Sequence, residues 1–470
     1  MNITLQGKQA EVMALPVTGH TVVLGTAGSG KTTIALQRAI FLSNLPSKPL
    51  VLLVTFNNAL VEYMKSINNR VCPGLVVESY HKFARGYLNS RGKMPSYNGV
   101  LSTNKKREYI EKAIFQCRNE YPYESTFERS KEFFYDEIVF IQQFGFKNFS
   151  EYQQAERIGR ASAYITRENR KWIAKVYERY LELRAADGLK YDWDDLAFYA
   201  NCELEIDNTE RRYTHIIVDE GQDFSPMMIK SLVNATHDRG SFTFFGDVAQ
   251  QIYGNRLSWR DSGIETSKIW KFEINYRNPE SIIKFSQDII KSKYWKQKMD
   301  MISATPFIAE GPKPILVRFS NVTNEIAWIT DRAISMSRTS SVVVVCRSYE
   351  GQAILESAFK NKGQYIHLIS KDTPGVRNSK DIYISTYHSV KGLEFDYVFV
   401  PLLDSNHFPN QKAIEAAVSQ EIAYSDELKL LYVAATRSKY GLYMTYSGEL
   451  SFLFPESSMN YDYYQENDGI

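Results

Sequence analysis

Gly25-Thr26-Ala27-Gly28-Ser29-Gly30-Lys31-Thr32 follows directly on the apolar run Val22-Val23-Leu24 and precedes a helical pattern over residues 34–42. This stretch fits the phosphate-binding pattern G-x-x-x-x-G-K-[ST], which requires a strand before it and a helix after it. Glycines in such a turn let backbone N–H groups face phosphate oxygens, and the helix N-terminus adds positive charge. Lys31 is expected to reach the β- and γ-phosphates, and the Thr32 hydroxyl to hold Mg²⁺. The sequence therefore predicts a site for a nucleoside triphosphate with Mg²⁺.

The composition limits the class of protein. The chain has 470 residues, which is too long for one hydrophobic core and predicts roughly two to four domains. Its formal net charge is +2, so any basic surface for nucleic acid has to be local. Its four cysteines lie far apart without a C-x-x-C pair, which favours reduced thiols over a zinc or iron–sulfur site. Since the N-terminus lacks a signal-peptide pattern and no apolar stretch of about eighteen residues occurs, we expect a cytoplasmic protein without membrane contact.

Strand and helix patterns alternate along most of the chain, which is typical of α/β domains with parallel sheets. Residues 105–186 differ, because they are poor in strand patterns and carry helical spacing. Their aromatic stripe from Trp172 to Leu181 is more typical of a buried helix face than of a ligand site. The expected strands cover residues 22–24, 49–55, 75–78, 216–219 and 242–245 in a first set, and 315–319, 341–346, 365–369, 382–386 and 397–401 in a second.

A second chemical element is the segment Ile216-Ile217-Val218-Asp219-Glu220-Gly221-Gln222-Asp223. An apolar run that ends in two carboxylates places both at the C-terminal end of a strand, where ligands of open α/β sheets collect. Asp219 is expected to hold Mg²⁺, and Glu220 to orient and deprotonate the water that attacks the γ-phosphate. The alternative is a solvated acidic strand end without a ligand.

The segment Asp219–Asp223 resembles the D-E-x-Q-D motif of superfamily 1 helicases of the UvrD/Rep/PcrA type. Other motifs of that family are matched in the same order along the chain, from Leu5 to about Ser447. The ordered set is far more specific than any one short motif. The matching segments are residues 5–9 (glutamine motif), 55–60 (motif Ia), 80–83 (motif Ib), 191–196 (a short motif before the acidic strand), 246–254 (motif III), 273–277 (motif IV), 386–395 (motif V) and 431–437 (motif VI).

The resemblance implies an α/β fold of two RecA-like P-loop domains with parallel sheets, plus a helical insertion (1B) in the first. The large 2B insertion of the family is expected to be absent, because only residues 370–380 fill the gap where it would stand. We expect domain 1A over residues 1–88 and 187–280, subdomain 1B over 89–186, domain 2A over 281–455 and a flexible C-terminal tail over 456–470.

The resemblance also assigns residues to ATP, which is expected to bind between the two domains. Gln9 would read the adenine, Tyr276 would stack on it and Glu394 would contact the ribose. Thr33 departs from the family, which usually carries arginine there. The expected catalytic residues are Lys31, Glu220, Gln250 as sensor, and Arg277 and Arg437 at the γ-phosphate from across the cleft. The expected nucleotide-binding residues are Gln9, Gly25, Gly28, Ser29, Gly30, Lys31, Thr32, Thr33, Tyr276 and Glu394, with Thr32 and Asp219 on Mg²⁺.

By the same resemblance, single-stranded DNA is expected to lie across both domains, with bases stacked on aromatic rings and phosphates on polar groups. Asn255 stands where motif III often has a second aromatic residue, and the nearby Trp259 is expected to substitute for it. Residues 291–298 interleave lysine with aromatic residues, which suits either nucleic acid or a solvated helix end. The expected strand-binding residues are Thr55, Phe56, Asn58, His81, Tyr253, Trp259, Thr386 and His388.

The implied function is an ATP-dependent translocase or helicase on single-stranded DNA or 3′-tailed duplex, moving 3′ to 5′ by family analogy. One alternative is a nucleotide-gated DNA-binding subunit of a larger nuclease, repair or defence complex. Another is an RNA-directed motor or an RNA-polymerase-displacing factor, although the N-terminal coiled-coil arm of the latter is not expected here. The biological pathway, and the need for a protein partner in duplex unwinding, stay open at this point.

Overall fold

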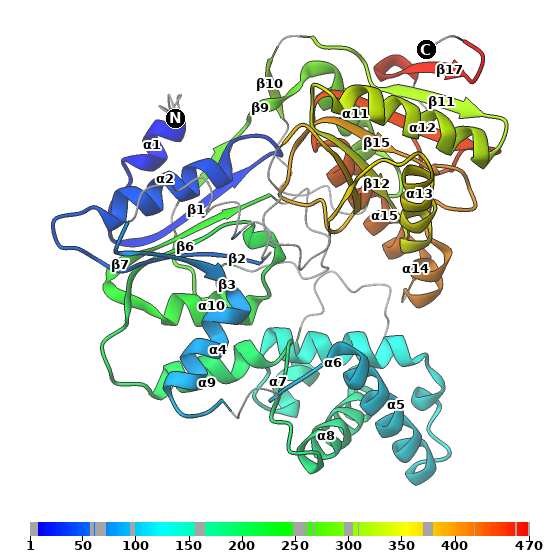
Figure 1. The fold of residues 1–470 in the computed structure, drawn as a ribbon. Coiled ribbons are helices and arrows are strands. Elements are labelled where there is room, and N and C mark those ends of the chain that lie inside the picture. The colour runs from blue at the N-terminus through cyan, green and yellow to red at the C-terminus, as the bar shows by residue number, and fades with distance from the viewer. Residues whose placement is uncertain are drawn as a thin grey trace.

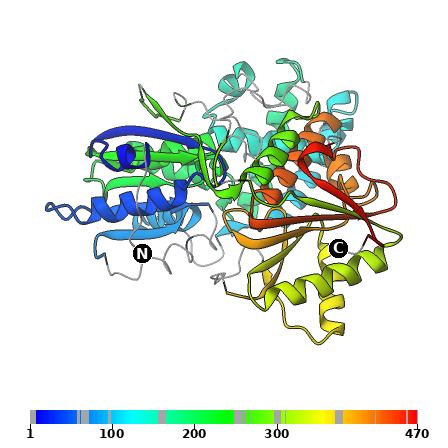
Figure 2. The same cartoon turned by 90° about the horizontal axis from the view of Figure 1, so that it is seen from above.

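The computed structural model describes residues 8–56, 61, 72–94, 99–155, 165–247, 259, 262–266, 268–295, 304–308, 310–369, 379–417, 419–455 and 458–468. They form two α/β domains with parallel sheets, and a helical body beside the first domain (Figure 1). Viewed from above, the two α/β domains lie side by side (Figure 2). The prediction of an α/β fold with parallel sheets in two domains is therefore confirmed.

The sheet of the first domain has the strand order β3-β2-β6-β7-β1-β8 in the described part of the chain, and every pair in it is parallel. Side chains alternate across the sheet, so Val23 packs with helix α2 on one face, while Val22 and Leu24 join the core under α4, α9 and α10 on the other. The strands are β1 (Gly19–Gly25), β2 (Val51–Thr55), β3 (Leu75–Ser79), β6 (Tyr213–Val218), β7 (Thr236–Gly246) and β8 (Ile269–Phe272), and the helices are α1 (Lys8–Met13), α2 (Lys31–Ser43), α4 (Tyr80–Ser90), α9 (Leu196–Ile206) and α10 (Pro226–Asn234).

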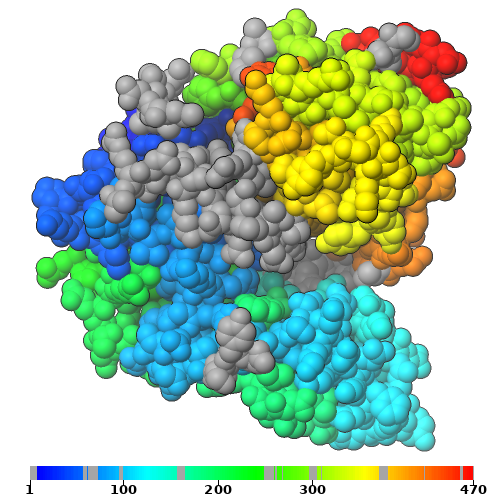
Figure 3. All heavy atoms as spheres, viewed as in Figure 1, coloured from blue at the N-terminus to red at the C-terminus, as the bar shows by residue number. Residues whose placement is uncertain are grey.

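The helical body has a hydrophobic core of its own, which includes Ile173, Val176 and Tyr180. Trp172, Tyr177 and Leu181 pack against that core, so the aromatic stripe is a core face, as predicted from its spacing. In the space-filling view this body projects from the first domain and lies below the second (Figure 3). Its helices are α5 (Thr103–Glu120), α6 (Lys131–Phe144), α7 (Phe149–Gln154) and α8 (Arg170–Ala186), and the short strands β4 (Val100–Leu101) and β5 (Tyr191–Asp192) pair where it joins the first domain.

The second sheet has the order β13-β14-β12-β15-β16-β11-β17 among the described residues. Helices α12 and α13 cover one face of it, and α11 and α15 cover the other. Its strands are β11 (Ile315–Phe319), β12 (Val342–Cys346), β13 (His367–Ile369), β14 (Ile382–Thr386), β15 (Phe395–Val400), β16 (Ser438–Ser447) and β17 (Asp462–Gln465), and its helices are α11 (Glu280–Lys291), α12 (Val322–Ser337), α13 (Tyr349–Asn361), α14 (Gln411–Ala416) and α15 (Gln420–Ala435).

Strand β9 (Ile274–Pro279), which the sequence placed in domain 1A, pairs with β10 (Thr305–Ile308) rather than with the first sheet. Its Asn278 donates side-chain hydrogen bonds to the carbonyl oxygens of Thr436 and Ser438. Strand β9 is thus attached to the second domain, because the Asn278 side-chain amide donates hydrogen bonds to two backbone carbonyl groups there.

The expected flexible tail over residues 456–470 is wrong for the part of it that the structure describes. Strand β17 adds to the sheet in parallel with β11, with Ile315 opposite Asp462. Tyr461 is buried, and its ring lies against Phe285 and Phe454. The tail is ordered because it fills a gap in the core and covers a strand edge that would otherwise leave N–H and C=O groups unpaired.

Among the described residues, no helix combines the length and the apolar composition that crossing a bilayer needs.

Replacing Tyr461 by alanine is expected to lower the free energy of unfolding by about 3 kcal/mol, because a large buried ring is removed from the core. The matched control is Tyr463→Ala on β17, since that side chain is 44% exposed and should change stability by no more than about 0.5 kcal/mol. Thermal denaturation of both variants measures the difference. Equal midpoints for the two would contradict the packing of the tail.

Candidate active site

The loop Gly25–Lys31 wraps around the amino group of Lys31. Strand β1 ends at Gly25 and helix α2 begins at Lys31, so the loop connects a strand end to a helix N-terminus. The Lys31 Nζ atom donates to the carbonyl oxygens of Gly25 at 2.9 Å and of Thr26 at 2.7 Å, and it lies 3.7 Å from the Asp247 carboxylate. A lysine held over a glycine-rich turn in this way is the arrangement with which P-loops bind phosphate.

Gly28 is the point at which this loop touches the segment that leads to the second domain. Its carbonyl oxygen accepts a hydrogen bond of 2.9 Å from the Tyr276 backbone N–H. Its φ angle is +72°, and a Cβ atom at this position would lie 2.4 Å from Asn275 Oδ1 and 2.8 Å from the Arg277 Cβ atom. Only glycine fits here, because both the backbone conformation and the close approach exclude a side chain.

Asp219 lies directly after strand β6 and is buried. Burial, and then the charge of Glu220, raise the pKa of Asp219 to about 7, while the nearby Thr32 hydroxyl favours its charged form. Its Oδ2 atom has no hydrogen-bond partner among the described residues. A buried carboxylate with a free oxygen beside a hydroxyl group fits Mg²⁺, which prefers hard oxygen ligands. Among the described residues, no group of three or more His, Cys, Asp or Glu side chains is placed to hold a metal ion.

Glu220 is held in an unusual backbone conformation, with a φ angle of +52°. Such a geometry costs about 1–3 kcal/mol for a residue other than glycine, and it persists only where the surroundings enforce it. Burial would raise the pKa of Glu220, but the charges of Lys391, Lys31 and Arg437 outweigh burial and hold its pKa below the usual value. The Gln222 side-chain amide also donates to its carboxylate. The group is therefore an ionised, oriented carboxylate at neutral pH.

The second domain contributes two arginines to the same pocket. Arg277 and Arg437 line it together with Glu220 and the P-loop residues from Ala27 to Thr33. The Arg277 Nε atom donates to Glu394 at 2.9 Å, and the Arg437 guanidinium donates to the carbonyl oxygens of Val433 and Leu393. Burial, followed by the nearby charge of Arg277, lowers the pKa of Arg437 to about 10, so it remains a cation at neutral pH. Two cations thus face the P-loop across the boundary between the domains.

A second pocket shares Ser29 with the first and has largely apolar walls. Gln9 and Tyr276 line it, together with Phe272 and Ile274. The Gln9 amide donates to the Ser29 carbonyl oxygen at 3.1 Å, and the Phe307 ring lies 5.0 Å from the Tyr276 ring, centroid to centroid. The first pocket offers the P-loop and two arginines, and the adjoining pocket offers apolar walls and the Gln9 amide, with Lys8, Glu11 and Glu273 also in its lining. This arrangement fits the phosphate and base ends of a nucleotide.

Family models match both halves of the chain. A UvrD/REP helicase N-terminal domain matches residues 5–271, and a UvrD-like helicase C-terminal domain matches residues 364–449. The chain belongs to the UvrD/Rep helicase family.

Several relatives of this UvrD/Rep family member carry helicase names. A probable DNA helicase of Mycoplasma pneumoniae is 24% identical over 91% of this chain and 80% of its own length. The ATP-dependent DNA helicase Rep of Buchnera aphidicola is 24% identical over 74% of this chain and 54% of its own length. DNA helicase II of Haemophilus influenzae is 24% identical over 61% of this chain and 40% of its own length. The chain thus spans most of the first relative but only about half or less of the other two.

Aromatic rings gather in this UvrD/Rep family member where strands β2 and β3 end. The rings of Phe56 and His81 lie 5.6 Å apart, and Phe224 lies 6.1 Å from Phe56. Trp193, which the sequence analysis did not single out, lies 5.2 Å from His81 and edge-on to it. The tryptophan at the centre of the matched segment 191–196 was the signal that could have found it. Trp259 has a different place, because its ring packs on Phe244 at 5.0 Å beside the core of the first domain.

The remaining strand-binding candidates lie at strand ends or outside the described residues. Thr55 ends β2, and its hydroxyl is buried without a hydrogen-bond partner in the described part of the chain. Thr386 ends β14, where its hydroxyl donates to the Ser389 hydroxyl at 3.0 Å, and His388 lies on the turn that follows. The strand-binding candidates Asn58 and Tyr253 fall outside the described residues, and so does Gln250, the expected sensor residue of the catalytic site.

Replacing Gly28 by alanine is expected to lower ATP affinity at least tenfold, because the added Cβ meets Asn275 and Arg277 and pushes the P-loop away from the second domain. The matched control is Gly19→Ala, since Gly19 has a φ of +78° but open space around it. That control should cost only the backbone strain, about 1–2 kcal/mol of stability. Titration with a fluorescent ATP analogue measures affinity, and equal affinities of both variants would contradict the proposed contact.

Proposed function

We propose that this chain is an ATP-dependent translocase and helicase that moves 3′ to 5′ on single-stranded DNA. The observation that carries the proposal is one pocket lined by the P-loop, by Glu220 and by Arg277 and Arg437 from the second domain. Hydrolysis in such a pocket removes the γ-phosphate that residues of both domains would contact, so the contacts between the domains change. Repeated closure and opening of two domains is a way to move a bound strand.

The chemistry assigned to the site is phosphoryl transfer to water. Thr32 and Asp219 would hold Mg²⁺, which neutralises charge on the phosphates when bound. Glu220, ionised and oriented by Gln222, would accept the proton of the attacking water. Arg277 and Arg437 would stabilise the charge that develops on the transferred group, an effect worth roughly 10³–10⁵ in rate for such arginines.

The coupling to DNA is proposed to run through charged contacts between the domains. Lys391 lies on the turn after β14, close to the candidate strand contacts Thr386 and His388, and pairs with Asp223 of the first domain. Gln222 accepts a hydrogen bond of 2.8 Å from the Asp247 backbone N–H, so the acidic segment is also tied to the residue that faces Lys31. Changes at the γ-phosphate would therefore reach strand contacts on both domains.

Efficient unwinding of duplex DNA is proposed to depend on a protein partner. Residues 370–381 are all that connect β13 to β14, at the place where enzymes of this type carry the 2B insertion. The runner-up function, a nucleotide-gated DNA-binding subunit of a larger nuclease, repair or defence complex, rests on the same observation. It differs from the first proposal in requiring little ATP turnover without the partner.

Glu220→Gln is expected to retain ATP binding and to lower kcat by at least 10³, because the amide cannot accept a proton from water. Lys31→Ala is the companion variant, and it should lose ATP binding as well, since it removes the cation held in the loop. ATP affinity and steady-state hydrolysis measure the two effects. Turnover by Glu220→Gln at the wild-type rate would remove this residue as the base.

Single-stranded DNA is expected to raise the ATPase rate at least tenfold, since strand binding across both domains favours the closed pocket. RNA of the same sequence is the control that separates a DNA motor from an RNA motor. Strand displacement with 3′-tailed and 5′-tailed duplexes then tests direction, with activity expected on the 3′ tail. An ATPase indifferent to every single strand would exclude the motor.

A further inference from the structure

The segment that joins the helical body to the first domain carries three carboxylates, on Asp192, Asp194 and Asp195. Its flanking residues Tyr191 and Leu196 belong to the core of the first domain. Asp192 and Asp195 are buried, and Asp194 is 24% exposed at its side chain. The turn 192–195 is therefore anchored in the first domain while its charged side chains need partners from elsewhere.

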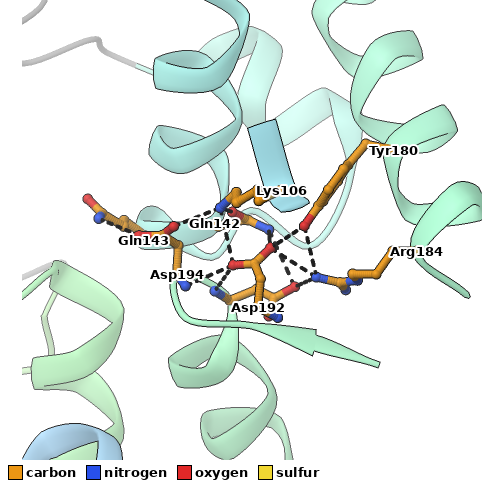
Figure 4. Close-up of polar contacts among 8 residues, drawn as sticks. Lys106, Gln142, Gln143, Tyr180, Arg184, Asp192 and Asp194 are labelled. Carbon is orange, nitrogen blue, oxygen red and sulfur yellow. Dashed lines mark hydrogen bonds and ion pairs between the residues drawn. The ribbon is translucent and has the colours of Figure 1, made fainter. Parts of the chain in front are cut away.

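Besides backbone N–H groups of the turn itself, the hydrogen-bond partners among the described residues are side chains of the helical body (Figure 4). The Lys106 Nζ atom on α5 donates to Asp194 at 2.7 Å and to Asp192 at 3.1 Å. From α8, the Arg184 NH1 atom donates to Asp192 at 3.0 Å and also to Asp195. Two further contacts are made by the Tyr180 hydroxyl to Asp192 at 2.6 Å and by the Gln142 amide to Asp192 at 2.8 Å.

The charges of the turn 192–195 and of its partners Lys106 and Arg184 depend on one another. Burial opposes the charge of Asp192, yet Lys106 and Arg184 hold its pKa at about 2. Burial and the charge of Asp192 raise the pKa of Asp195 to about 7. Replacing such a buried network by apolar side chains is often neutral or stabilising, so stability alone does not account for it. Its directional contacts instead hold one geometry between the helical body and the turn.

Trp193 lies in the turn 192–195. Its ring lies 5.2 Å from that of His81, centroid to centroid, and edge-on to it. The Arg85 guanidinium lies 6.0 Å from the Trp193 ring centre on the side of α4. Asp192 and Asp194 flank Trp193 in the chain. The hydrogen bonds from Lys106 to both carboxylates therefore restrain the tryptophan between them.

We propose that Lys106 and Arg184 are positioning residues for single-strand binding. They hold the turn 192–195 so that Trp193 and His81 keep a common orientation at the candidate strand path. The helical body thereby sets the affinity for single-stranded DNA without contacting the bound ATP. This inference rests on the proposed function.

The test compares the oligonucleotide concentration that half-saturates ATPase stimulation in matched variants. Lys106→Met combined with Asp194→Asn removes one charge of each sign, so it leaves no unpaired buried ion. Arg184→Gln removes a cation, and Arg184→Lys restores it, since one nitrogen atom of Arg184 makes both carboxylate contacts. Lys175→Met is the surface control on α8, because its ion pair with Glu178 is half exposed.

The double variant and Arg184→Gln are expected to raise the half-saturating concentration about tenfold, with the basal ATPase rate within twofold of wild type. Arg184→Lys and Lys175→Met should stay within threefold of wild type in both quantities. Iodide quenching of Trp193 fluorescence, obtained by subtracting Trp193→Phe in each background, should increase in the double variant and in Arg184→Gln. Quenching reports the position of the ring independently of ATP turnover.

The outcomes separate this inference from the proposed function. Unchanged half-saturation and quenching in the double variant and Arg184→Gln, with a wild type that responds to DNA, would overturn the positioning role alone. A parallel fall of the basal and stimulated rates at unchanged half-saturation would also overturn it, since that pattern marks a loss of folded protein. If single-stranded DNA does not stimulate the ATPase of the wild type, both the proposed function and this inference are wrong.

Discussion

The carboxylate of Glu220 stays ionised inside the protein because cations from both domains surround it. Lys31 comes from the P-loop, whereas Lys391 and Arg437 come from the second domain. A buried carboxylate without such neighbours would take up a proton, because a low-dielectric interior penalises charge. Part of the charge that keeps the pKa of Glu220 below its usual value thus comes from the second domain, so the electrostatics of the site depend on the domain arrangement.

The nucleotide pocket and the domain interface are largely the same surface. Gly28 accepts a hydrogen bond from Tyr276, and the same strand β9 is attached through Asn278 to the carbonyl oxygens after α15. A ligand on the P-loop therefore lies directly against the strand that leads into the second domain. The P-loop and the second domain are therefore connected by direct contacts through strand β9.

Buried ion pairs connect the bodies of this protein to one another. The pair Lys391–Asp223 bridges the two α/β domains, and Lys106 and Arg184 bridge the helical body and the first domain. Ionic contacts are directional and costly to leave unpaired, so they select one relative geometry, whereas apolar cores such as those under α10 and α15 supply most of the stability.

Much of the fold and of the nucleotide site followed from local patterns. The P-loop between a strand and a helix, the acidic end of β6 and the helical segment around Trp172 all depend on residues that are neighbours in the chain, and periodicity reveals such neighbours. The order of the tail did not follow, because β17 owes its place to β11 and to the core around Phe285. The partners of the charged residues did not follow either: Lys391 and Asp223 are separated by 168 residues, and Arg277 and Glu394 by 117. Contacts between such distant positions are set by how whole domains pack, and no spacing along the chain encodes that.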